Sequence, residues 1–117
     1  MARRMVIAAF EELVLRAVHN EGADAYGVPI RKRLEAITGK EVSVGALYTT
    51  LGRLEEKGYI SSRMGEKTEA RGGRAKKYFK VEGAGYSALA EAQKVRDSAD
   101  VASSWLPGVV HGEGMAY

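Results

Sequence analysis

Residues 43–60 read SVGALYTTLGRLEEKGYI, and this stretch decides the fold that the whole chain is expected to adopt. Ser43 is a good helix N-cap and Gly58 a good helix stop, so we expect a helix between them. One side carries apolar residues at helical spacing: Val44, Leu47, Tyr48, Leu51 and Leu54. The opposite side is unusually small for a surface helix: Gly45, Ala46, Thr49, Thr50 and Gly52.

The composition is that of an ordinary soluble domain. The chain has 117 residues, 45% of them hydrophobic and 28% charged, which suits one domain with one modest core. No stretch is long and apolar enough for a membrane span, and the start MARRMVIAAF is too short for a signal peptide. Without cysteine there can be no disulfide and no thiolate metal site. We expect a cytoplasmic protein.

Charge is distributed unevenly along the chain. Residues 1–80 hold 16 Lys or Arg against 10 Asp or Glu, a balance of +6, whereas residues 81–117 hold 2 against 5, a balance of −3. The basic residues concentrate in residues 61–80. This polarity predicts a basic face for a polyanion and a separate segment with another task. A solvated charged loop is the alternative.

Two helices are expected before the quoted one. The first covers about residues 5–20, with Gly22 beyond its end, and the second covers residues 27–38, ended by Gly39. The apolar residues that define them are Val6, Ile7, Phe10, Leu13, Val14 and Ala17 in the first, and Ile30, Leu34 and Ile37 in the second.

After Gly58 the pattern changes to that of a hairpin. YISSRM (59–64) and KKYFKV (76–81) have the β-branched and aromatic residues of two short strands. Between them, GEKTEARGGRA (65–75) is rich in glycine and charge, which is typical of a long hairpin loop.

Residues 83–106 return to a helical pattern and carry a seam of small apolar residues. The spacing is 4, 3, 4, 3, 4, that of a heptad: Ala88, Ala92, Val95, Ala99, Ala102 and Leu106. Small side chains let two helices approach closely, so we expect this helix to pack on a partner copy; packing on its own domain is the alternative. Pro107 and Gly108 end it, and residues 107–117 are expected to form a flexible tail.

The element order predicts an α+β, mainly α fold. Three helices followed by a β-hairpin, over residues 1–82, form a winged helix-turn-helix, whose third helix enters the DNA major groove. Gly45 and Ala46 would let the backbone come close, and the helix end attracts phosphate. Thr49, Thr50 and Arg53 can bond phosphates or bases, and we expect Arg53 to read a base. The alternative is that the glycines have no role in binding and are simply tolerated in a surface helix.

The sequence also resembles the PadR family of winged-helix transcriptional regulators. The matching pieces span roughly residues 10–90 and are more specific together than singly: Tyr26-Gly27, the S-x-G-x-L-Y segment at 43–48, R-L-E-x-x-G-x-I at 53–60, Gly72-Gly73-Arg74 followed by Tyr78-Phe79, and Gly85-x-x-x-Leu89. Thr49 stands where many members of the family have proline. The family usually opens its last helix with a threonine cap and a glutamate, and Val81-Glu82-Gly83 does not supply this pair, so we expect the last helix to begin less sharply.

The resemblance implies a cytoplasmic DNA-binding homodimer, usually a repressor, that pairs through its C-terminal helix and sometimes its first helix. Many members respond to phenolic or drug-like compounds. Pattern and resemblance together predict contacts to a double-stranded operator by Ser43, Gly45, Ala46, Tyr48, Thr49, Thr50, Arg53, Arg71, Gly72, Gly73, Arg74, Lys76 and Lys77. They predict dimer contacts by Phe10, Leu13, Ala88, Ala92, Val95, Ala99, Ala102 and Leu106.

Catalytic chemistry finds little support, and no cofactor or metal is expected. His19 and His111 have no partner at metal-ligand or triad spacing. The pairs Glu11-Glu12 and Glu55-Glu56 are interpreted as solvated faces.

Trp105 is a candidate stacking surface for a flat aromatic effector, although a tryptophan there is more often a core or interface anchor. A winged-helix module for protein partners, without specific DNA readout, is the alternative function, and shape-only binding of nucleic acid is a third.

Overall fold

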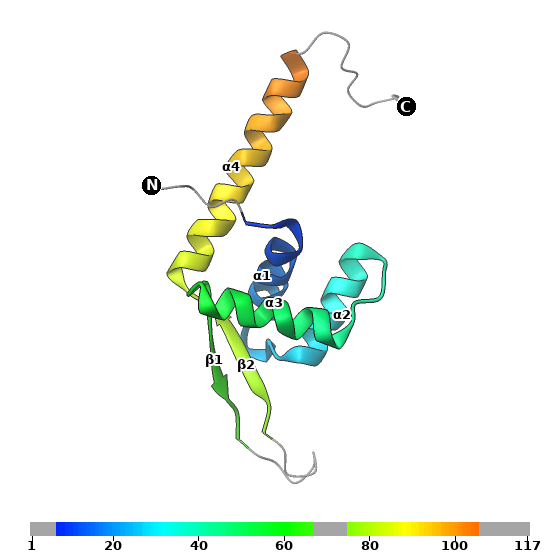
Figure 1. Cartoon of the computed structure of the whole chain (residues 1–117), viewed down its shortest axis with the longest axis vertical. Coiled ribbons are helices and arrows are strands. Elements are labelled where there is room, and N and C mark those ends of the chain that lie inside the picture. Colours follow the sequence, from blue (N-terminus) through cyan, green and yellow to red (C-terminus); the bar gives the residue numbers. More distant parts are fainter. Residues whose placement is uncertain (1–6, 67–74, 106–117) are drawn as a thin grey trace.

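Three helices, a two-stranded sheet and a long last helix follow one another in the order that the sequence predicts (Figure 1). The structure, a computed structural model, describes residues 7–66 and 75–105, with side chains described through residue 99. Its elements are α1 (Ala9–Glu21), the short 3-10 turn η1 (Gly22–Asp24), α2 (Gly27–Thr38), α3 (Val44–Glu56), β1 (Ile60–Met64), β2 (Lys77–Val81) and α4 (Gly83–Trp105).

Local capping signals set most helix ends. The Ser43 hydroxyl accepts a hydrogen bond from the Ala46 N–H at 3.0 Å, so Ser43 caps α3 as predicted. Gly39 ends α2 with φ +71°, where its N–H donates to the Glu35 carbonyl at 2.8 Å. The first helix begins at Ala9, later than expected; residue 6 and those before it lie outside the described residues.

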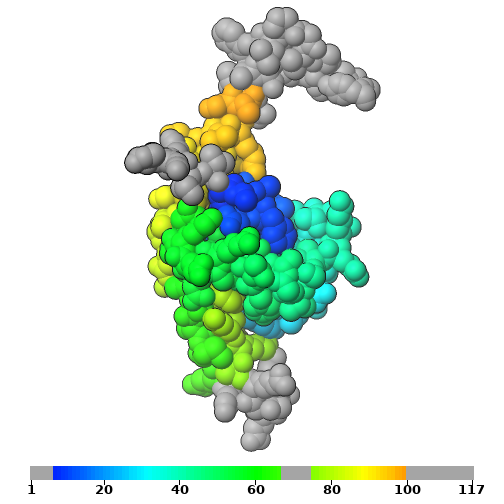
Figure 2. Space-filling view, viewed as in Figure 1, coloured from blue at the N-terminus to red at the C-terminus, as the bar shows by residue number. Residues whose placement is uncertain are grey.

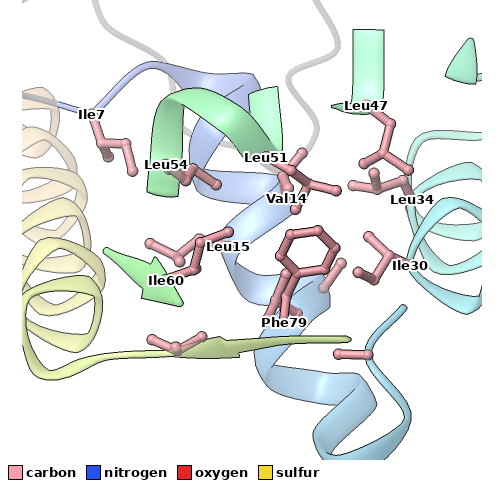
Figure 3. Packing of buried hydrophobic residues seen from close by; sticks show 14 of the residues in the cluster. Ile7, Val14, Leu15, Ile30, Leu34, Leu47, Leu51, Leu54, Ile60 and Phe79 are labelled. Carbon is pink, nitrogen blue, oxygen red and sulfur yellow. The ribbon is translucent and has the colours of Figure 1, made fainter. Parts of the chain in front are cut away.

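The core lies where α1, α2 and α3 meet the sheet (Figure 3). β1 and β2 pair antiparallel, with Ile60 opposite Val81, and Ile60 and Phe79 extend the core from the strands. Burying these side chains stabilises the arrangement, each contributing about 1.5–3 kcal/mol. The largest fully buried side chains are Leu15, Ile30, Leu34, Leu47, Leu51, Leu54, Ile60, Val14 and Val18.

Helix α3 is rotated relative to the stripe that the sequence predicts. Thr50 is only 6% exposed, whereas Val44 and Tyr48 are 51% and 46% exposed. The buried arc consists of Leu47, Thr50, Leu51 and Leu54. The small threonine side chain is buried where α3 packs on the rest of the domain, and this turns two apolar residues outward. Ile37, expected inside α2, is likewise 48% exposed.

The acidic pair Glu11-Glu12 is buried, so its interpretation as a solvated face was wrong. Glu12 is 4% exposed and accepts from the Arg96 guanidinium at 2.6 Å and from Arg16 at 2.9 Å. Glu11 accepts from the Lys57 ammonium at 2.9 Å. Both carboxylates lie inside because cations from α3 and α4 reach them, and these ion pairs fix both helices on α1.

Helix α4 packs on its own domain over its first half and then extends beyond it (Figure 1). Ala92 is 8% exposed and Ala88 is partly buried against the core, so both pack on their own domain, and contact of these two with a partner stays a prediction. Val95 is 44% exposed and Ala99 is exposed too. The side chains of Ala102 and Trp105, and residue Leu106, lie outside the described residues. The reason is geometric: α1 lies against the first part of α4, as far as Arg96, which pairs with Glu12.

Gly85 allows α4 to approach the end of the α3–β1 connection. A Cβ at this position would collide with the Tyr59 carbonyl oxygen and lie 2.8 Å from Val81 Cγ1. At Gly83, two residues earlier in the same helix, a Cβ would meet nothing within 4 Å. The glycine of the Gly85-x-x-x-Leu89 motif is therefore required by packing.

We expect Gly85→Ala to destabilise the protein by about 1–3 kcal/mol, because backbone atoms must shift to accept the methyl group. Urea unfolding followed by circular dichroism measures the change. Gly83→Ala is the matched control and should leave the stability unchanged or raise it slightly, because alanine favours a helix. Equal stabilities of the two variants would contradict this account.

Candidate nucleic-acid interface

Helix α3 crosses the middle of the face seen in Figure 2, with α2 beside it and the hairpin extending below. The N-terminal half of α3 therefore lies next to α2, and its C-terminal end lies next to the strands. This arrangement presents the exposed side of α3, the start of α2 and the base of the hairpin together.

The bare side of α3 is open to solvent, as the sequence predicts. A Cβ added at Gly45 or Gly52 would meet nothing within 4 Å. The predicted contact residues exposed on or beside this helix are Ser43, Gly45, Ala46, Tyr48, Thr49 and Arg53. Thr50 is the exception: its side chain is buried, so its assignment to the exposed side was wrong.

Tyr48 and Arg53 lie on different flanks of α3. At about 100° per residue, they are separated by about 140° around the helix. Glu55 lies on the Tyr48 flank and accepts from the Ser62 hydroxyl at 2.6 Å, with Lys77 at 3.9 Å. The Tyr48 flank therefore faces the hairpin, while Arg53 faces the other way. That Arg53 reads a base stays a prediction.

A stack of aromatic and cationic side chains attaches the hairpin to the start of α2. The Lys76 ammonium lies 3.6 Å from the centre of the Tyr26 ring, whose centre is 5.4 Å from that of Tyr78. The Arg63 guanidinium covers the Tyr78 ring at 4.7 Å. Such cation–π contacts hold basic side chains in place without neutralising them. Lys76 and Lys77 thus stand near α3, while Arg71, Gly72, Gly73 and Arg74 lie outside the described residues.

Sequence reasoning missed the part played by Tyr26 and Arg63. Tyr26 forms an isolated antiparallel bridge with Tyr78, and the Phe79 N–H donates to the Ala25 carbonyl at 2.8 Å. The segment before α2 thus adds to the edge of the sheet. The only signal was the spacing of Lys76 and Tyr78, two residues apart in a strand, which predicts a common strand face but not what covers it.

A groove of about 260 Å³ runs between α2 and α3. Its lining combines apolar and charged side chains: Gly27, Val28, Arg31, Lys32, Glu35, Val44, Leu47 and Tyr48. The charged members Arg31 and Glu35 are bound to the protein itself. Arg31 Nε donates to the Val42 carbonyl at 2.7 Å, and the Glu35 carboxylate accepts from the Val42 N–H at 2.8 Å.

The histidine and acidic residues that the structure describes lie in the ranges 7–66 and 75–105. No group of three or more His, Cys, Asp or Glu is placed there to hold a metal ion. His19 Nδ1 lies 3.1 Å from the Tyr86 hydroxyl, with the rings edge to face. His111 lies outside the described residues. No helix in this part of the chain is long and apolar enough to cross a membrane.

The three-helix unit, its exposed third helix and its hairpin define a protein of the winged helix-turn-helix class. A family model described as the transcriptional regulator PadR-like family matches residues 14–91. The chain therefore belongs to the PadR-like family, which confirms the prediction made from its motifs. Comparison with the curated proteins gave no match.

Solved structures agree with the family. A PadR-like transcription factor from Bacteroides fragilis is 26% identical, with a TM-score of 0.70 over 81% of this chain and 86% of that one. RosR from H. salinarum is 27% identical, with a TM-score of 0.64 over 82% and 79%. A PadR family transcription regulator from Clostridium difficile, 24% identical, has a TM-score of 0.63 over 84% and 98% and shows the fold. The comparisons support a DNA-binding transcriptional regulator.

Proposed function

We propose that this chain is a homodimeric repressor that binds a nearly palindromic operator in double-stranded DNA. The observation that carries the proposal is the exposed side of α3, which has open space at Gly45 and Gly52. Lys76 and Lys77 lie beside it, where the hairpin joins the domain. A helix so stripped of long side chains can bring its backbone to base edges and phosphates in the major groove.

The dimer is proposed because one winged helix reads too few base pairs to select one site in a genome. Two copies related by a two-fold axis would read half-sites about one helical turn apart. Val95 and Ala99, both exposed on α4, support pairing through this helix. Phe10 and Leu13, partly buried on α1, are the second candidate surface.

Repression follows if the operator overlaps a promoter, since the bound dimer would exclude the polymerase. This role places the protein in the cytoplasm with the chromosome and requires no enzymatic activity or cofactor. Relief by a small aromatic effector is the finer part of the proposal. It is supported by the family resemblance and by Trp105 in the last turn of α4.

Selection from a pool of random DNA duplexes tests the DNA-binding proposal. The purified chain should enrich a motif with two-fold symmetry and bind it about 10³–10⁷ times more tightly than scrambled DNA at moderate salt. Placing the motif over the promoter of a reporter gene should lower expression when the chain is present. A pool without any enriched motif would overturn the proposal, and an enriched motif without repression would restrict it to DNA binding.

A further inference from the structure

The groove between α2 and α3 has an exposed apolar rim. Val28 on α2 is 55% exposed, and Val44 and Tyr48 on α3 are 51% and 46% exposed. These three side chains come from the first turns of two helices and line the same groove, above the buried Leu47. None of them belongs to the buried core, so together they leave apolar surface open to solvent in one groove, which is typical of a binding site.

Gly27 sets the position of Tyr48 in this groove. A Cβ on Gly27 would collide with the Tyr48 hydroxyl oxygen and lie 2.9 Å from the ring carbon that bears it. The absence of a side chain on α2 therefore lets the tyrosine ring lie against that helix. As a result the ring lines the same groove as the two valines.

The exposed part of α3 offers few groups for reading bases by hydrogen bonds. Apart from Arg53, on the flank that faces away from the hairpin, its exposed residues through three turns are Val44, Gly45, Ala46, Tyr48, Thr49 and Gly52. None is Arg, Lys, Asn or Gln, the side chains that make bidentate contacts with guanine or adenine. The major groove presents one apolar feature, the C5-methyl group of thymine, and apolar side chains recognise it.

Charge favours DNA as the occupant of this groove. Lys32, exposed on α2, lines it, and Lys76 stands on Tyr26, which precedes Gly27 in the chain. The one acidic residue in the lining, Glu35, is bound to the Val42 N–H and lies 3.7 Å from Arg31. Residues 1–80 as a whole carry a balance of +6. Phosphates beside the groove would therefore find cations.

We propose that Val28, Val44 and Tyr48 form an apolar contact for thymine methyl groups, so that each operator half-site carries thymine at one or two fixed positions. This inference rests on the proposed DNA-binding function and adds the feature of the base that is read. Specificity at these positions comes from a methyl group instead of a hydrogen bond.

Replacement of thymine by deoxyuridine in the selected operator tests the proposal, since it removes only the methyl group. Burial of one such group corresponds to about a fourfold change in affinity. Band-shift titrations with one deoxyuridine at a time should show this loss at one or two positions in each half-site. The same change in both half-sites should lower affinity by about 16-fold.

The variants Val44→Ala and Val28→Ala identify the protein side of the contact. In at least one of them the deoxyuridine penalty should fall toward onefold, while circular dichroism shows an unchanged fold. Ile37→Ala is the matched control, because Ile37 is 48% exposed on α2 but does not line the groove. This variant should keep the full penalty.

The outcomes separate the inference from the proposed function. A chain that selects no DNA sequence overturns the proposed function itself. Selective binding without a deoxyuridine penalty at any position overturns only the methyl contact. A penalty that persists in both valine variants and in Tyr48→Ala also overturns it, because the methyl groups would then be read elsewhere on the protein.

Discussion

Val95→Asp or Ala99→Glu should give a folded monomer that keeps weak, salt-sensitive DNA binding and loses operator recognition. Both side chains are exposed on α4 and lie outside the buried core, so neither change disturbs the core. Closely packed helices have no room for added bulk, and a carboxylate in their contact would lack a partner. Loss of the second half-site should remove about 10³-fold or more of the preference for operator over scrambled DNA.

Ala90→Glu is the control for this experiment. Ala90 is exposed on the same helix and lies nine residues before Ala99, which places it about 180° around the helix axis. Ala90→Glu adds the same glutamate side chain and charge as Ala99→Glu, yet this variant should remain a dimer with full operator affinity. Light scattering gives the oligomeric state and a band shift gives the affinity. A dimer that survives both seam variants would move the interface to α1, around Phe10 and Leu13.

Local features of the fold were predictable because their causes lie within a few residues. The cap at Ser43 and the glycine stops at Gly39 and Gly58 each depend on backbone geometry that one residue controls. The change from helical to strand periodicity after Gly58 is similarly local. These signals, together with the family motifs, were enough to predict the winged-helix architecture.

The errors arose where distant parts of the chain meet. Glu12 is buried because Arg96, 84 residues later, pairs with it, and Glu11 because Lys57, 46 residues later, does so. Periodicity cannot supply such partners.

The same reason explains the rotation of α3 and the packing of α4. The apolar pattern of α3 fits two rotations about its axis, and packing on the domain selected the one that buries Thr50 and exposes Tyr48. In α4, a seam of alanines suits a partner helix and the chain's own α1 equally well. The structure places Ala92 against its own domain. The location of the candidate site on α3 and the hairpin could thus be predicted from the sequence, but the exposure of its individual side chains could not.

The second large effect concerns salt and the lysines at the base of the hairpin. A dimer that neutralises about 6–10 phosphates loses about 10³–10⁵ in affinity between about 50 and 200 mM salt, because condensed counterions are released on binding. Lys76 is held 3.6 Å from the Tyr26 ring, which does not neutralise its charge, and Lys77 is exposed and lies 3.9 Å from Glu55, the outer limit of an ion pair, so a phosphate can compete for it.

Lys76→Gln combined with Lys77→Gln removes four cations per dimer and should therefore lower the slope of log affinity against log salt by up to about 3.6, since each phosphate contact contributes about 0.9. Because phosphate contacts carry no sequence code, operator and scrambled DNA should weaken by similar factors. Fluorescence anisotropy titrations at several salt concentrations measure both quantities. Lys94→Gln is the control: Lys94 is exposed on α4, away from α3 and the hairpin, and its loss should leave the slope unchanged. A wild-type affinity that barely changes over this salt range would refute electrostatic docking. An equal change in slope for Lys94→Gln would mean that Lys76 and Lys77 contribute no more to DNA binding than any other exposed lysine.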